Sequence, residues 1–160
     1  MKKIIILLMV ALTSCQVAQT QQSSDILSEV YVKRVIDGDT IVLNNDMRVR
    51  LYGIDAPEIS QSFGLFARDW LKRTIEHKTV TLEQKGFDRY GRMIAIVKTK
   101  HANINETLVY IGLAWVYERY CDEPYKQKWI SFQKAAKKYR RGVFSEPLPI
   151  PPWEFRKQNR

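Results

Sequence analysis

Residues 30–58 read VYVKRVIDGDTIVLNNDMRVRLYGIDAPE, and this stretch decides the expected fold. Segments rich in β-branched residues at 30–36 and 40–43 flank Asp37-Gly38-Asp39, and Asp-Gly is a favoured hairpin dipeptide. After a second turn rich in Asn and Asp, residues 47–52 alternate apolar with polar side chains, and two of the polar ones are arginines. The pattern predicts two successive hairpins that form a meander with one basic face.

The rest of the chain combines two further strands with helices. Apolar side chains at helical spacing predict helices over 64–75, 104–113 and 122–141, and strands are expected at 79–83 and 92–98. We therefore expect an α+β fold, a five-stranded OB-fold β-barrel with three packed α-helices. Barrels of this type bind oligonucleotides.

Two of the predicted helices have local signals at their ends. Asn103 is expected to cap the second helix, with Glu106 three residues later as in a capping box. Gly142 follows the third helix as a C-terminal signal.

The first part of the chain, residues 1–14, is predicted to be a signal peptide. A basic start is followed by an apolar run at 4–12, which is too short for the roughly 20 residues of a membrane-spanning helix. The run ends in Leu12-Thr13-Ser14-Cys15, which resembles a bacterial lipobox. That resemblance implies cleavage before Cys15 and lipidation of this cysteine. The alternative is a secretory signal that is cut nearby, with no role for Cys15.

Three further segments follow. Residues 15–28 are rich in Gln, Ser and Thr and are expected to form a flexible tether, and 29–144 form the folded domain. The end, 145–160, contains the proline-rich run 147–153, for which we expect polyproline II structure rather than helix. We interpret it as a strap laid over the domain and anchored by Trp153. A docking motif for a proline-binding partner is the alternative.

Charge and composition limit the classes of function. The 160 residues include 26 Lys and Arg against 17 Asp and Glu, a formal net charge of +9. With 45% hydrophobic and 27% charged residues, the chain is typical of a globular protein and unlike disordered or collagen-like chains. The positive charge predicts a polyanion or an anionic membrane surface as partner, and does not distinguish between them.

Four carboxylates lie close together in the sequence: Asp37, Asp39, Asp55 and Glu58. Calcium prefers several oxygen ligands of this kind. Pairing of the strands that follow Asp39 and precede Asp55 would bring these two residues together, and Pro57 stiffens the segment between Asp55 and Glu58. Turn formation alone is the alternative explanation of Asp-Gly-Asp.

Two arginines add groups that can bind a phosphate. Arg50 lies five residues before Asp55 on the polar face of its strand, and Arg92 begins a later strand. A guanidinium matches two phosphate oxygens and stays charged. Hydrolysis of a phosphodiester needs a cation, positive groups where charge builds on the phosphoryl oxygens, and a group that orients or deprotonates water. The two arginines, two aspartates and Glu58 provide these parts.

Three motifs together resemble those of the staphylococcal nuclease (thermonuclease) family: Val35-Ile36-Asp37-Gly38-Asp39-Thr40, Val49-Arg50-Leu51-Tyr52-Gly53-Ile54-Asp55-Ala56-Pro57-Glu58 and Asp88-Arg89-Tyr90-Gly91-Arg92. The ending 149–154 is also similar to that of many small bacterial members. The resemblance implies an OB-fold barrel with three helices that cleaves DNA and RNA using Ca²⁺.

The resemblance also implies roles for single residues in the metal site. Asp39 and Asp55 match the calcium-ligating carboxylates, and Ala56 matches a position that supplies a backbone carbonyl. Glu58 matches the residue that is proposed as general base.

Other matched positions contact the nucleic acid. Arg50 and Arg92 match the arginines that bind the scissile phosphate, and Tyr90 matches an aromatic residue that stacks on a base, which is tolerant of sequence. Tyr120 is our assignment for a tyrosine that contacts phosphate, with Tyr117 as the alternative.

Three hypotheses follow. The first is a calcium-dependent phosphodiesterase, monomeric by default, that is anchored by lipid outside the cytoplasm on a bacterial membrane, at its periplasmic face or the cell surface. The second is a catalytically inactive OB-fold lipoprotein that binds nucleic acid. The third is a basic lipoprotein that binds anionic lipid or polymer, and it leaves Asp39, Asp55 and Glu58 without a role.

Overall fold

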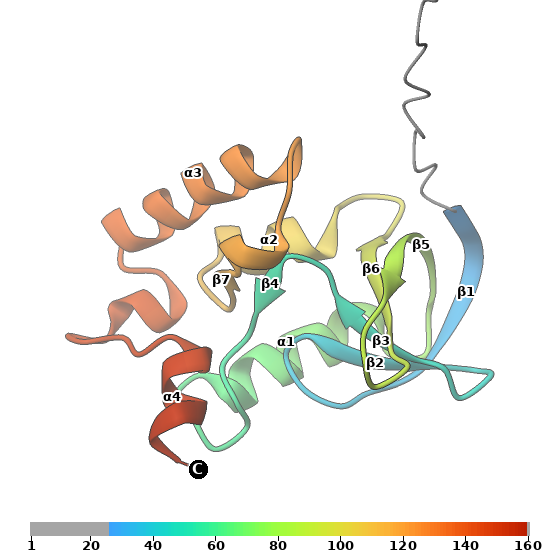
Figure 1. Cartoon of the computed structure of the whole chain (residues 1–160), viewed down its shortest axis with the longest axis horizontal. Coiled ribbons are helices and arrows are strands. Elements are labelled where there is room, and N and C mark those ends of the chain that lie inside the picture. The colour runs from blue at the N-terminus through green and yellow to red at the C-terminus, as the bar shows by residue number, and fades with distance from the viewer. Residues whose placement is uncertain (1–25, 160) are drawn as a thin grey trace, which may run out of the picture.

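The computed structural model describes residues 26–159, and the predicted signal peptide and most of the tether lie outside them. The elements, in chain order, are β1 (Ile26–Val35), β2 (Thr40–Leu43), β3 (Arg48–Leu51), β4 (Ile54–Asp55), α1 (Gly64–Ile75), β5 (Thr79–Phe87), β6 (Met93–Lys98), α2 (Ile104–Tyr110), β7 (Trp115–Val116), the 3₁₀ turn η1 (Glu118–Tyr120), α3 (Tyr125–Lys138), the 3₁₀ turn η2 (Gly142–Ser145) and α4 (Pro152–Gln158). Figure 1 shows the barrel strands on one side and α3 and α4 on the other.

Five strands close into a barrel in the order β1-β2-β3-β6-β5. The first three form the predicted meander, and β6 then pairs in parallel with β3, so that Arg50 lies opposite Ile94. The long strand β1 closes the barrel because it pairs with β2 over its second half and with β5 over its first, with a register shift in each pairing. The predicted five-stranded α+β barrel is therefore confirmed.

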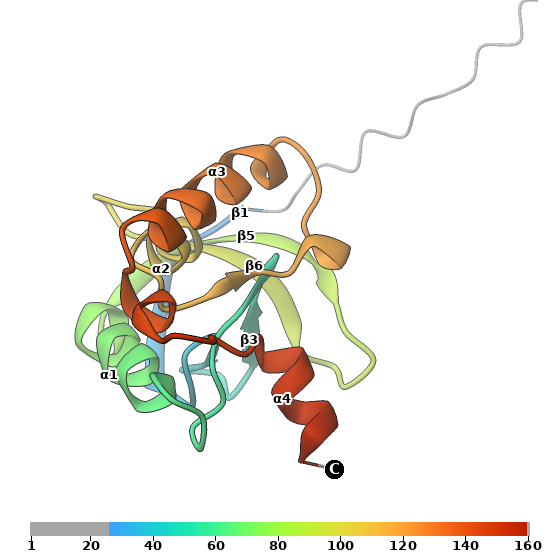
Figure 2. The same cartoon turned by 90° about the vertical axis from the view of Figure 1, so that its left-hand side faces the viewer.

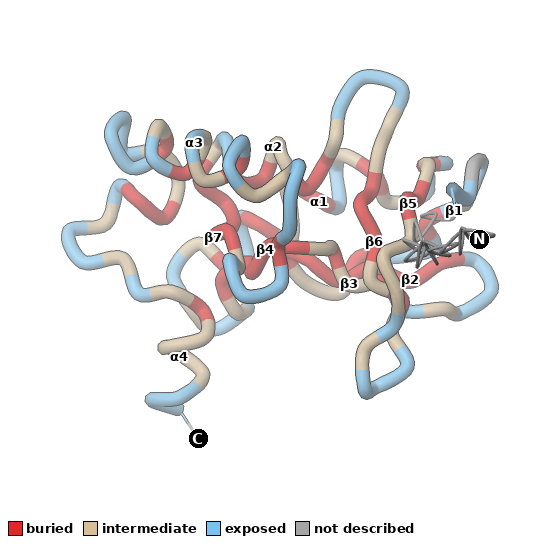
Figure 3. Tube along the Cα trace, turned by 45° about the horizontal axis from the view of Figure 1, so that its top comes forward, coloured by how far each residue is buried: buried red, intermediate tan, exposed pale blue. Residues whose placement is uncertain are grey.

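The barrel interior is filled by side chains that alternate along the strands. Val32, Ile41, Val49, Leu82 and Ile96 are each 0% exposed. Figure 3 shows buried residues along the strands and at intervals along the helices. Because β-branched and aliphatic residues fill a small barrel completely, its lumen is a packed core and ligands have to bind outside it.

Three helices cover the barrel as predicted. Helix α1 buries Ala67, Leu71 and Ile75, which recur every fourth residue and so lie on one helical face. Helices α2 and α3 pack against each other and against the barrel, with Trp129 fully buried between them. No helix of residues 26–159 is long and apolar enough to span a membrane.

A fourth helix corrects one sequence prediction. The proline-rich run was expected to exclude helix, yet Pro152 and Trp153 form the first turn of α4. Proline is favoured at the first helical position, because its fixed φ suits a helix and its missing N–H would have no partner there. The preceding Pro151 has φ −62° and ψ 145°, the polyproline II conformation expected for this run.

A small sheet connects the barrel to the helices. Strand β4 pairs antiparallel with β7, so that Asp55 lies opposite Trp115. Both strands follow glycines that bend the chain: Gly53 (φ 68°) before β4 and Gly112 (φ 75°) before β7. This sheet fixes Asp55 at the rim of the barrel, and Figure 2 shows α4 close to the same rim.

Candidate active site

Asp39 and Asp55 meet at the guanidinium of Arg50. Asp39 immediately precedes β2, Arg50 lies on β3 opposite Thr40, and Asp55 ends β4. Arg50 Nη2 donates to Asp55 Oδ1 at 2.6 Å, and Arg50 Nη1 contacts Asp39 Oδ1. The side chains of Asp39 and Asp55 are only 4% and 1% exposed. Because a buried carboxylate needs a partner, Arg50 is the charge that makes this pair compatible with burial.

Asp39 also fixes the loop that follows β4. The backbone N–H of Ala56 donates to Asp39 Oδ2 at 2.6 Å. The close approach depends on Gly38, because a Cβ there would lie 2.6 Å from the Cβ of Ala56 and 2.7 Å from that of Ala67. Asp37 Oδ1 accepts the backbone N–H of Asp39 at 3.0 Å. The Asp-Gly-Asp sequence therefore both forms a turn and builds the site.

Charge and burial oppose each other around Arg50. Burial raises the pKa of the Asp37 carboxyl, and the nearby Arg50 charge limits that rise. Burial also lowers the pKa of Arg50, against the attraction of Asp55 and Asp37. The pKa values of both groups are thus shifted by burial and by neighbouring charge, as is common at functional sites.

Glu58 is joined to this set by a residue that the sequence analysis did not identify. Arg156 of α4 donates from Nη1 to Glu58 Oε1 at 2.7 Å and from Nη2 to Asp55 Oδ2 at 2.7 Å. Its hydrogen bond to Asp55 raises the pKa of Arg156 above the ordinary arginine value. One signal could have found it: if Pro152 is taken as the first helical residue, Arg156 follows Trp153 by three positions and shares its face.

Arg92 and Tyr90 lie on the turn between β5 and β6. Arg92 Nε donates to Asp88 Oδ2 at 2.7 Å, and Asp88 Oδ1 accepts the backbone N–H groups of Tyr90 and Arg92. Burial tends to raise the pKa of Asp88, but these hydrogen bonds outweigh it and lower the pKa. Arg92 lies two residues before Ile94, the partner of Arg50 across the sheet, and so shares its face. Tyr90 is 69% exposed.

The two tyrosine candidates occupy different positions. The Tyr117 N–H donates to Gly53 O at 2.9 Å, next to the strand that ends in Asp55. Its ring stacks on Trp153 of α4 with a centroid distance of 5.3 Å and an interplanar angle of 3°. Tyr120 packs edge-on against Tyr117 and is 54% exposed. Tyr117 is thus the more closely tied of the two to the carboxylates.

The donor atoms fit a hard divalent cation. Asp39, Asp55 and Glu58 offer carboxylate oxygens, and Ala56 offers a backbone carbonyl, the ligand types that calcium prefers. Within residues 26–159, no three acidic, His or Cys side chains are arranged as a metal cluster. Instead, the guanidinium groups of Arg50 and Arg156 lie between the carboxylates.

Comparison with known proteins gives consistent matches. A family model described as "Staphylococcal nuclease homologue" matches residues 48–146. An "Uncharacterized endonuclease" of Escherichia coli O157:H7 is 40% identical over 129 residues, 78% of this chain and 82% of that protein. A "Micrococcal nuclease" of Shigella flexneri is 37% identical over 141 residues, 81% of this chain and 80% of that protein. An "Uncharacterized endonuclease" of Haemophilus influenzae is 36% identical over 133 residues, 81% of this chain and 73% of that protein.

Proposed function

The chain belongs to the staphylococcal nuclease family, and we propose that it is a calcium-dependent phosphodiesterase that hydrolyses DNA and RNA with low sequence specificity. The observation that carries the proposal is the meeting of Asp39 and Asp55 around Arg50, with Glu58 on the adjoining loop. The net charge of +9 suits a polyanionic substrate.

The metal ligands in this proposal are Asp39, Asp55 and the carbonyl of Ala56. Calcium there would supply Lewis-acid stabilisation of charge on the phosphoryl oxygens. The two aspartates are anchored by Arg50 and by the Ala56 N–H, so that little rearrangement of the backbone is needed.

The remaining roles fall to side chains with access to solvent. Glu58 has a side chain 38% exposed, and in the proposed mechanism it takes a proton from the attacking water. Arg50 and Arg92 provide permanent positive charge where the phosphate gains negative charge. The exposed ring of Tyr90 stacks on a base, and Tyr120 or its neighbour Tyr117 contacts a phosphate.

Cleavage of single-stranded DNA and RNA by the full-length chain tests this function. Cleavage is expected with Ca²⁺ and is expected to stop with chelator or with Glu58→Gln. Glu118→Gln, which removes an exposed carboxylate of η1, is the matched control and should cleave as the unchanged chain does. Binding of nucleic acid without cleavage in Ca²⁺ or Mg²⁺ would instead support the inactive OB-fold binding protein.

We also propose that the chain is a lipoprotein held outside the cytoplasm through Cys15. The support is the sequence Leu12-Thr13-Ser14-Cys15, which lies outside the described residues. Mass spectrometry of the protein from membranes should find lipid on Cys15, and Cys15→Ser should abolish membrane attachment. Cys121→Ser is the control, because the Cys121 side chain is buried. Membrane attachment that survives Cys15→Ser would contradict lipidation at this position.

A further inference from the structure

Arg156 comes from the last helix, 98 and 101 residues away in sequence from the carboxylates that it contacts. Its Nη2 bonds Asp55 Oδ2 at 2.7 Å, while its Nη1 bonds Glu58 Oε1 at 2.7 Å and Asp55 Oδ1 at 3.2 Å. A single planar guanidinium therefore holds both oxygens of Asp55 and one of Glu58. Such fork-shaped, charge-assisted bonds are among the stronger polar contacts in proteins.

The segment that carries Arg156 is fixed on both sides of the site. On one side, Trp153 stacks on Tyr117 and meets the edge of Trp115, which lies opposite Asp55 in the β4–β7 sheet. The long Arg156 side chain thus extends from a docked helix.

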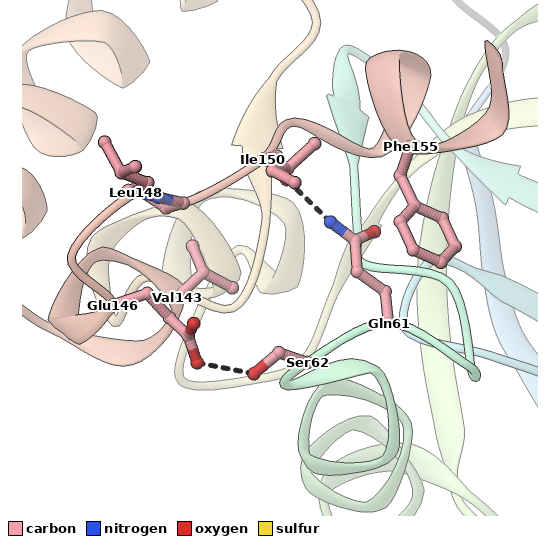
Figure 4. Close-up of a pocket in the computed structure, with 8 residues that line it drawn as sticks. Gln61, Ser62, Val143, Glu146, Leu148, Ile150 and Phe155 are labelled. Carbon is pink, nitrogen blue, oxygen red and sulfur yellow. Dashed lines mark hydrogen bonds between the residues drawn. The ribbon is translucent and has the colours of Figure 1, made fainter. Parts of the chain in front are cut away.

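On the other side, the segment is bound to the loop after Glu58. Gln61 Nε2 donates to Ile150 O at 2.6 Å, and Ser62 Oγ donates to Glu146 Oε1 at 2.6 Å. Figure 4 shows both bonds across a pocket of about 160 Å³, with Phe155 beside Gln61. The same loop presents Glu58, so that α4 and Glu58 are held relative to each other.

Both carboxylate oxygens of Asp55 already accept hydrogen bonds from arginines, and this affects how a cation can bind there. Asp55 Oδ1 accepts from Arg50 and Arg156, and within residues 26–159 Oδ2 accepts from Arg156. A cation coordinated by Asp55 has to take over at least one of these oxygens. Arg50 is the more deeply buried of the two arginines, with 19% of its side chain exposed against 38% for Arg156. Arg156 is therefore the group that can leave toward solvent.

We propose that Arg156 is a positioning residue that acts as an internal counter-cation: it holds Asp55 and Glu58 and competes with the divalent cation for Asp55. This inference rests on the proposed function, because it concerns the affinity of that same site. The C-terminal helix then sets the cation concentration at which the nuclease becomes active, while Trp153 keeps the helix docked when the guanidinium moves away.

Calorimetric titration of the full-length chain with CaCl₂, in detergent and without nucleic acid, tests the competition. If the arginine occupies Asp55 about nine-tenths of the time, Arg156→Gln should lower the calcium Kd about tenfold. The matched control is Lys157→Gln, which removes the same charge one position further along α4, where Lys157 pairs with Glu154. Its Kd should stay within about twofold. A calcium Kd of Arg156→Gln that is equal to or higher than that of the parent chain would overturn the proposal.

A second variant separates competition from loss of the helix. Arg156→Lys keeps the charge but lacks the planar fork that engages both oxygens of Asp55, so its Kd is expected between those of the parent chain and Arg156→Gln. The near-ultraviolet circular dichroism of the tryptophans should be the same in both variants, because Trp153 stays docked.

Asp55→Asn distinguishes failure of this inference from failure of the proposed function. If the parent chain binds calcium and Asp55→Asn does not, the cation site stands, and the comparison of Arg156→Gln with the parent decides the inference alone. If neither the parent nor Arg156→Gln binds calcium, the calcium-dependent function fails and the inference with it. Binding by Arg156→Gln but not by the parent would support the competition most strongly.

Discussion

One guanidinium, that of Arg50, lies between the buried carboxylates of Asp39 and Asp55. Removing it would leave the buried carboxylate of Asp39 without its Arg50 partner, whereas Asp55 would keep its bonds to Arg156. Breaking a buried ion pair by deleting one partner costs about 3–5 kcal/mol, because the remaining charge is uncompensated. The residue is therefore expected to stabilise the barrel rim in addition to its proposed role at the phosphate.

Arg50→Met should lower the free energy of unfolding by about 3 kcal/mol at pH 7, for the reason just given. Urea denaturation followed by circular dichroism measures it. Arg48→Met is the matched control, since Arg48 is an exposed arginine of the same strand, and its effect should stay below about 0.5 kcal/mol. Equal unfolding midpoints for the two variants would argue that Arg50 is not needed to neutralise the carboxylates.

Arg92→Ala should separate catalysis from folding. Arg92 is held by Asp88 on a turn and has 30% of its side chain exposed, so that its removal leaves the core intact. A group that acts on developing phosphate charge is worth roughly 10²–10³ in kcat. Steady-state cleavage kinetics should show that loss with a nearly unchanged melting temperature.

The neighbouring arginine provides the control for this experiment. Arg89 lies on the same turn and stacks over Tyr90, at 4.8 Å from the ring centroid. Arg89→Ala should raise KM through weaker nucleic-acid binding and change kcat little. A kcat for Arg92→Ala equal to that of the unchanged chain would remove Arg92 from the mechanism.

At the scale of elements, Glu83 joins three of them. Its carboxylate on β5 accepts from Lys98 of β6 at 2.8 Å and from Tyr125 of α3 at 2.9 Å, and it pairs with Lys85 at 2.6 Å. Burial tends to raise the pKa of Glu83, but these bonds outweigh it and lower the pKa from 4.5 to about 2. The ionised carboxylate therefore stabilises the packing of α3 on the barrel through its bond to Tyr125.

The depressed pKa predicts how stability depends on pH. Because the folded pKa lies below the unfolded value, the contribution of Glu83 is fully present above about pH 4.5 and is lost as the pH falls toward 2. Glu83→Gln should lower the free energy of unfolding by about 2 kcal/mol at pH 7. The difference in unfolding free energy between this variant and the unchanged chain should become smaller between pH 4.5 and pH 3. Urea denaturation across this range measures it, and a difference that is constant with pH would contradict the assignment.

The capping box before α2 shows which features the sequence could predict. Asn103 was predicted as the N-cap, and its side chain accepts the N–H of Glu106 at 3.2 Å. The Glu106 side chain, in contrast, accepts from Trp129 of α3 and pairs with Lys128 instead of returning to the cap. The local half of the motif was predictable from spacing, whereas the other half depends on a helix more than 20 residues away.

The site residues also fall into those that local sequence could predict and those that depend on distant parts of the chain. Arg50, Asp39 and Asp55 could be brought together from the sequence because Asp39 directly precedes β2 and Asp55 soon follows β3, two strands that pair in one hairpin. Arg156 was missed because its helix begins inside a proline-rich run, where the preference of proline for the first helical position is the one local signal, and because the docking site on β7 lies far away in the sequence. The parallel pairing of β3 with β6, which brings Arg92 to the face of Arg50, also joins segments that no local turn connects.

At the scale of the whole molecule, the C-terminal segment ties the end of the chain to the barrel rim. Trp153 is its anchor, with Tyr117 stacked at 5.3 Å and Trp115 edge-on at 6.0 Å. Trp115 in turn packs against Phe144 at 4.6 Å, so that η2, β7 and α4 share one aromatic cluster. Loss of this anchor is expected to release α4 while the barrel, whose core is separate, stays folded.

Trp153→Ala should therefore destabilise the docking of α4 by about 2–3 kcal/mol, which is below the value for a fully buried Trp because Trp153 is half-buried. The expected observations are a reduced near-ultraviolet circular dichroism signal, faster amide hydrogen exchange confined to 150–158, and a far-ultraviolet spectrum close to that of the unchanged chain. Leu148→Ala is the control within the same segment, since Leu148 is 86% exposed and should cause none of these changes. If Trp153→Ala unfolded the barrel together with α4, the C-terminal segment would be an integral part of the folding unit and not a strap on a separate core. Amide exchange rates of the strands β1–β6, measured together with those of α4, distinguish the two cases. Independent docking of α4 leaves the strand amides protected, whereas a single folding unit does not.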